Sequence, residues 1–114
     1  MEAAMIIHNL NKFPDFRSYE HYDLYEFTEF DLDNLIGKGI DEIWYWYGCG
    51  GYEGIGWVLL RQGDTYDLHD LGHCSCYGPL DYCDPMWQSP ETIRERYSSE
   101  VMSEVADLLK AAKL

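Results

Sequence analysis

The amino-acid sequence predicts a single α+β domain over residues 1–114: an antiparallel β-meander of about three or more strands packed against a C-terminal amphipathic helix, with a His/Cys metal loop. Three observations lead to this expectation. The middle of the chain holds an aromatic and β-branched run, two further strand-like runs follow it after short turns, and the last quarter carries apolar residues at helical spacing. A chain of 114 residues has the usual length of one domain, and neither a linker nor an internal repeat divides it.

The predicted strands alternate with glycine-containing turns. In chain order we expect strand 43–47, turn 48–51, strand 52–61, turn 62–64 and strand 65–69. The first of these strands consists only of Ile, Trp and Tyr, which are residue types that favour strands. Gly54 and Gly56 interrupt the second strand, and they indicate a β-bulge or a close approach of two backbones.

A short helix is predicted ahead of the first strand. Thr28-Glu29-Phe30-Asp31 resembles a capping box, and Gly37 would end the helix. The positions expected to face the core are Leu32, Leu35 and Ile36. The preceding segment, residues 18–30, mixes aromatic side chains with carboxylates, and it indicates either a strand or an acidic helix.

The C-terminal helix has a clear start. In Ser89-Pro90-Glu91 the serine suits the N-cap, the proline suits the first turn and the carboxylate suits the positive end of the helix dipole. Apolar residues then recur at helical spacing: Ile93, Tyr97, Val101, Val105, Leu108 and Ala112. We expect this amphipathic helix to pack on the sheet.

The net charge restricts the classes of partner. Aspartate and glutamate number 21 and lysine and arginine 8, which gives a formal charge of −13. Such a field repels nucleic-acid phosphates and anionic membranes, so direct binding to either is not expected. A basic protein partner is favoured instead, although acidity can also serve solubility alone.

The negative charge is concentrated between residues 20 and 42, where eight acids face one base, Lys38. These predicted partner-binding residues are Glu20, Asp23, Glu26, Glu29, Asp31, Asp33, Asp41 and Glu42. The first four follow one another at a spacing of three, which would place them on one side of a helix. The alternative is a solvated acidic face without a partner.

The N-terminus, residues 1–8, lacks a basic region and a long apolar stretch, so no signal peptide is expected. No segment approaches the length of a membrane span. The expected location is the cytoplasm, where cysteines are more often metal ligands or free thiols than disulfides. A monomer is expected, although the abundant Tyr and Trp would permit a dimer.

A compact His/Cys cluster predicts a structural zinc ion. The expected ligands are His69, His73, Cys74 and Cys76, with Cys83 in reserve. Zinc prefers thiolate sulfur and imidazole nitrogen in a tetrahedral arrangement. The Cys-x-Cys spacing is awkward, because an extended backbone points the two sulfurs to opposite sides. Asp70 could accept a hydrogen bond from a ligating imidazole.

Other readings of the cluster stay open. The cysteines could be free buried thiols, or Cys76 and Cys83 could form a disulfide. A small Cys/His or zinc-dependent hydrolase centred on His69 or Cys74 is a further alternative. No catalytic signature such as HExxH, GxSxG or a phosphate-binding loop is present, so we expect no enzyme.

Two sequence blocks resemble a family of small uncharacterised domains of phages and mobile elements. They are Tyr47-Gly48-Cys49-Gly50-Gly51-Tyr52-Glu53-Gly54-Ile55-Gly56-Trp57 and His69-Asp70-Leu71-Gly72-His73-Cys74-Ser75-Cys76-Tyr77-Gly78-Pro79. This resemblance implies a phage setting, and with it the cytoplasm of a bacterial host cell, but no particular activity.

In size, acidity and its His/Cys cluster the chain also resembles anti-CRISPR proteins, some of which bind metal. That resemblance implies a non-enzymatic inhibitor that acts as a DNA mimic, binds a basic CRISPR effector such as Cas9 and hinders the loading of nucleic acid. An acidic immunity protein that neutralises a nuclease toxin is the alternative, because the same charge supports it.

Overall fold

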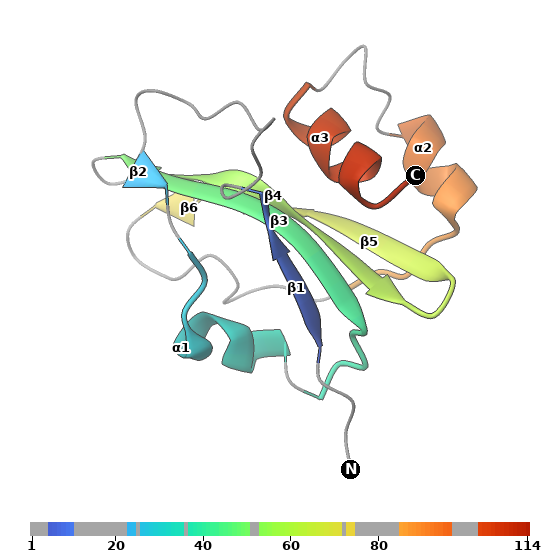
Figure 1. Cartoon of the computed structure of the whole chain (residues 1–114), viewed down its shortest axis with the longest axis horizontal. Helices are drawn as coiled ribbons and strands as arrows, with labels where there is room; N and C mark the ends of the chain where they lie inside the picture. Colours follow the sequence, from blue (N-terminus) through green and yellow to red (C-terminus); the bar gives the residue numbers. More distant parts are fainter. Residues whose placement is uncertain are drawn as a thin grey trace.

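A mixed β-sheet forms the centre of the computed structural model (Figure 1). The structure describes residues 5–10, 23–24, 26–35, 37–50, 53–71, 73–74, 85–96 and 103–114. The strands are β1 (Ile6–Asn9), β2 (Asp23–Leu24), β3 (Glu42–Gly50), β4 (Glu53–Gln62), β5 (Thr65–Asp70) and β6 (His73–Cys74). The predicted meander is confirmed as β3, β4 and β5, which pair antiparallel in that order.

The two outer sides of the β3–β4 hairpin each carry two strands. β1 and β2 pair with different parts of β3, and β5 and β6 pair with different parts of β4. β1 runs parallel to β3, whereas all other pairs are antiparallel. This parallel strand was not predicted, because a four-residue segment paired with a partner more than thirty residues away leaves no local turn signal.

The hairpin is longer than its glycines indicated. β3 continues through Gly48 and Gly50, which the sequence placed in a turn, and one register links Glu42 with Arg61 and Gly50 with Glu53. That unbroken register shows that the bulge expected in β4 is absent. The alternative, a close backbone approach, is confirmed at Gly56, where an added Cβ would collide with the carbonyl oxygen of Trp46.

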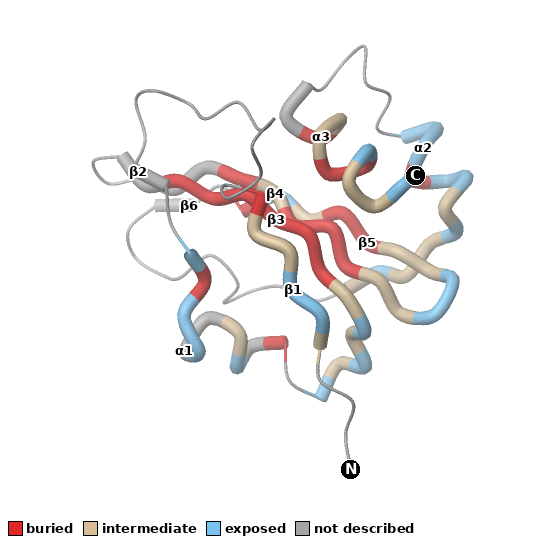
Figure 2. Tube along the Cα trace, in the orientation of Figure 1, coloured by how far each residue is buried: buried red, intermediate tan, exposed pale blue. Residues whose placement is uncertain are grey.

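Both faces of the sheet are buried, as the red segments in Figure 2 show. Side chains alternate along β3, so that Trp44 and Trp46 lie in one apolar cluster and Tyr45 and Tyr47 in the other. The first cluster contains Leu10, Trp44, Trp46, Leu59, Leu68, Ile93, Val105, Leu108 and Leu109. The second contains Phe27, Leu35, Ile43, Tyr45, Tyr47, Val58, Leu60 and Leu71.

The short helix ahead of the sheet is confirmed as α1 (Glu29–Leu32) followed by the 3₁₀ turn η2 (Asp33–Leu35). The Leu32 N–H donates to the Thr28 carbonyl at 3.0 Å, and Leu35 is buried in the second cluster. Gly37 has a φ of 81°, which suits the residue that ends a helix. Of residues 18–30, for which the sequence left a strand or an acidic helix open, 23–24 form β2 and 26–28 are not helical.

The C-terminal region forms two helices, α2 (Pro90–Arg96) and α3 (Ser103–Ala111), where the sequence predicted one. Ser89 caps α2 as predicted, since its Oγ accepts the Thr92 N–H at 3.2 Å. Both helices lie on the same side of the sheet (Figure 1), and their residues Ile93, Val105 and Leu108 are fully buried there. Tyr97 and Val101 lie outside the described residues. Within the described parts of the chain, no helix is long and apolar enough to cross a membrane.

Gly56→Ala should lower the free energy of unfolding by about 1–3 kcal/mol, because the new methyl group must displace the backbone of β3. Its Cβ would also lie 2.9 Å from the Tyr47 Cα. Denaturant unfolding of both proteins measures this difference. Gly37→Asn is the control: nothing lies within 4 Å of a Cβ there, and asparagine tolerates the positive φ. An equal effect of the two substitutions would contradict the prediction.

Candidate functional site

Three of the four predicted zinc ligands belong to strands that pair with one side of β4. His69 is a half-buried residue of β5, and the backbones of His73 and Cys74 form β6. Cys76 and Cys83 lie outside the described residues, as does the rest of the predicted metal loop. Among the residues whose side chains are described, no group of three or more His, Cys, Asp and Glu could hold a metal ion. The zinc site therefore stays a prediction.

The strand register separates the two histidines. His69 pairs with Val58 and His73 pairs with Gly54, so they face positions four residues apart on β4. At roughly 3.3 Å per residue, the two backbones lie about 13 Å apart. To bind one tetrahedral zinc ion, the two ring nitrogens must come within about 3.4 Å of each other, so both side chains would have to extend fully toward each other along the strand. The register therefore disfavours a single ion that both histidines bind.

Asp67 is a candidate that sequence reasoning missed. It lies between Tyr66 and Leu68 on β5, and it is buried with 5% of its surface exposed. Its carboxylate accepts a hydrogen bond from the Met86 backbone N–H, yet its Oδ2 has no hydrogen-bond partner. A buried carboxylate oxygen without a partner is costly, so it marks a place where a proton or a cation is expected.

Burial raises the pKa of Asp67 above its usual 3.8. The nearby charge of His69, the Met86 N–H and the charge of Arg96 all act in the opposite direction, and burial outweighs them. The one available sequence signal is the alternation of β5, which places residue 67 on the face opposite Tyr66 and Leu68. That signal is ambiguous, because an aspartate at such a position usually faces water.

The segment that leads into α2 covers this part of β5. Tyr66 and Gln88 exchange two backbone hydrogen bonds, both of 2.8 Å, and Trp87 packs against the second apolar cluster. Met86 itself is 73% exposed. Asp67 thus fastens this segment to the sheet through the Met86 N–H while its second oxygen points at no donor.

The predicted acidic residues do not form a single row. Among those whose side chains are described, Glu26, Glu29, Asp33 and Asp41 are exposed. The backbone of Asp23 belongs to β2, so the three-residue spacing from residue 20 does not lie on one helix. Glu20 and the side chain of Asp31 lie outside the described residues. Glu26 precedes α1, Glu29 is its first residue and Asp33 follows it, and all three are exposed. We name these three residues the α1 acidic surface.

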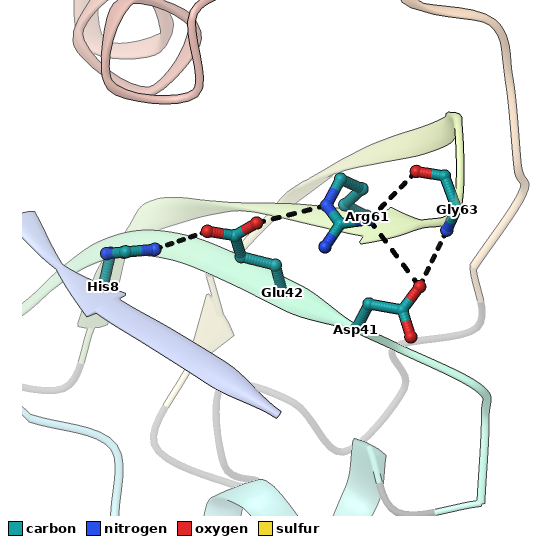
Figure 3. A network of polar contacts seen from close by, with 5 residues as sticks. All are labelled: His8, Asp41, Glu42, Arg61 and Gly63. Atoms are coloured by element: carbon teal, nitrogen blue, oxygen red, sulfur yellow. Dashed lines mark hydrogen bonds and ion pairs between the residues drawn. The ribbon is translucent and has the colours of Figure 1, made fainter. Parts of the chain in front are cut away.

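Asp41 and Glu42 are engaged in an internal network instead (Figure 3). The Glu42 carboxylate accepts from His8 Nε2 at 2.6 Å and from Arg61 Nε at 3.1 Å. Asp41 accepts the Gly63 N–H at 2.8 Å and lies 3.7 Å from the Arg61 guanidinium. The network joins β1 to the β4–β5 turn across the start of β3. Two of the eight predicted partner-binding acids therefore hold strands together.

Glu42→Gln should lower the free energy of unfolding by about 1–2 kcal/mol, because it weakens two charge-assisted hydrogen bonds in a partly exposed setting. Thermal or denaturant unfolding measures the change. Asp64→Asn removes the same charge from an exposed position in the adjacent turn and should have little effect. Similar losses in the two variants would show that the network adds nothing beyond net charge.

The raised pKa of Asp67 predicts an unusual pH dependence for metal-free protein. The folded state holds this proton more tightly than the unfolded state, so the contribution of Asp67 to stability is fully present below pH 3.8 and is lost as the pH rises through the raised pKa. Asp67→Asn keeps an oxygen for the Met86 N–H and removes the ionisation. Its stability relative to the natural chain should therefore increase with pH.

Denaturant unfolding of both proteins from pH 3.5 to 7, with a chelator present, measures this difference. A difference that is constant with pH, or that falls as the pH rises, would contradict burial as the dominant influence on Asp67.

Comparison with known proteins identifies no relative. No protein-family model matches the chain, and no match was found among curated proteins or solved structures. A function must therefore be argued from the residues of this chain.

Proposed function

We propose that this protein is a non-enzymatic inhibitor that binds a basic nucleic-acid-handling protein, in the first instance a CRISPR effector such as Cas9, and hinders the loading of nucleic acid. The supporting observation is the formal charge of −13 combined with exposed carboxylates on the α1 acidic surface. A protein that handles nucleic acid presents a positive groove to phosphates, and an acidic surface can compete for that groove.

The α1 acidic surface is better suited to this role than the rest of the predicted set. Glu26, Glu29 and Asp33 are exposed, whereas Glu42 is less exposed and its carboxylate accepts from His8 and Arg61. Exposure is what brings the three side chains within reach of a partner. The segment is held in place by buried anchors on both sides of the helix, since Phe27 and Leu35 belong to the second apolar cluster. A fixed position for the carboxylates lowers the entropy lost on binding.

A structural zinc ion is part of the proposal. It would stabilise the segment after β5, which the sequence cluster of histidines and cysteines supports. In this role the ion performs no chemistry on a substrate, and it contributes to binding only by keeping the fold intact.

The triple substitution Glu26→Gln, Glu29→Gln, Asp33→Asn tests the binding surface. Three exposed charge pairs at about 0.5 kcal/mol each correspond to about a tenfold loss of affinity at low salt. The control is Asp64→Asn, Glu91→Gln, Glu95→Gln, which removes the same charge from exposed positions elsewhere. Calorimetric or surface-based titration of both variants and the natural chain against a Cas9-type effector gives the affinities.

Raising the salt concentration from about 50 to 300 mM should weaken binding of the natural chain to the effector. It should also reduce the difference in affinity between the natural chain and the triple variant of the α1 acidic surface. Equal losses in the two triple variants would show that only net charge matters. Absence of effector binding would overturn the proposal, and tight binding to a basic nuclease toxin instead would establish the immunity protein.

A further inference from the structure

Asp67 and His69 are placed so that one metal ion can contact both. They are two residues apart on β5, opposite Leu60 and Val58 of β4, so their side chains lie on the same face of the strand. The backbones of Asp67 and His69 therefore lie roughly 6.6 Å apart along the strand, about half the backbone distance between His69 and His73. The charge of His69 also acts directly on Asp67, as expected of close neighbours.

The unpartnered oxygen of Asp67 is a second, independent observation that points to a cation. Its Oδ2 is buried and makes no hydrogen bond, while the Met86 N–H donates to the same carboxylate. Arg96 contributes a favourable charge from α2 but does not donate to this oxygen. A metal ion would satisfy the oxygen and compensate for the burial of the charge.

We propose that Asp67 and His69 form the core of the metal site, with zinc bound by a carboxylate oxygen of Asp67 and a ring nitrogen of His69. This inference rests on the structural zinc of the proposed function and changes its ligand set. Asp67 is added to the ligand set and His73 is removed from it. His73 pairs with Gly54 of β4, four residues from Val58, which is the partner of His69. Zinc accepts carboxylate oxygen at about 2.0–2.2 Å and imidazole nitrogen at about 2.0–2.1 Å, so the pair is chemically suitable.

The position of the pair also explains what the ion would stabilise. Met86, which donates to Asp67, belongs to the segment that leads into α2, and Tyr66 and Gln88 hold the same segment. An ion on Asp67 and His69 would therefore brace β5 against this segment. Because His69 is only half-buried, the ion could exchange with solvent on the exposed side.

Zinc content and affinity of four purified proteins test the proposal: the natural chain, Asp67→Asn, His69→Gln and the control Asp70→Asn. Asp70 is an exposed acid of the same strand on the opposite face, and the sequence alone favoured it as the carboxylate beside zinc. We expect about one zinc per chain in the natural protein and in Asp70→Asn. In Asp67→Asn and His69→Gln the affinity should fall at least about tenfold. Circular dichroism confirms that each variant is folded.

X-ray absorption at the zinc edge of the natural protein is a measurement that needs no variant. It should show at least two nitrogen or oxygen ligands, and an all-sulfur shell would overturn the proposal. Retention of zinc by Asp67→Asn would overturn the assignment while leaving a structural zinc in place. A natural protein without zinc would overturn both, and the effector titration would still decide the binding function separately.

Discussion

The burial of the β3–β4 hairpin on both faces is the constraint on which this fold depends. Residues 43–47 are all large, uncharged and buried, so exposing either face of the strand to water would be costly. The helices α2 and α3 cover one face, and α1 with its flanking residues covers the other. Gly56 permits the close approach of the two strands, since any side chain there would meet the backbone of Trp46.

The same constraint distributes the charge. With the centre of the sheet closed to water, the described acids lie around it, either at the surface or beside groups that compensate their charge. Glu26, Glu29 and Asp33 are exposed, and they form the surface proposed to meet a basic partner. Glu42 is matched by His8 and Arg61, and this match fixes β1 beside β3. The carboxylate of Asp67 is only partly satisfied. It accepts a hydrogen bond from the Met86 N–H, but its Oδ2 has no donor.

The two proposals use these two kinds of carboxylate. Exposed carboxylates act at long range and set the rate and salt dependence of association. A buried carboxylate oxygen without a hydrogen-bond partner acts only at contact distance. Its attraction to a cation is strong there, because the surroundings have a low dielectric constant. The proposed binding surface and the proposed metal site therefore lie on different elements, α1 and β5, and substitutions can test them independently.

Local patterns in the sequence determined the parts of this structure that depend on near neighbours. The residue types of β3, β4 and β5, the Gly63 turn, the Ser89 cap and the Gly37 helix end all follow from residues within a few positions of each other. The acidity and the His/Cys cluster are equally visible in the sequence. Only the tertiary structure decided that β1 pairs parallel with β3 and that Glu42 is occupied. The tertiary structure also decided that Asp67 is buried and that His69 and His73 pair with β4 residues four positions apart. The physical reason is that strand pairing and burial of the second sheet face join segments distant in sequence, and no local pattern records which segments meet.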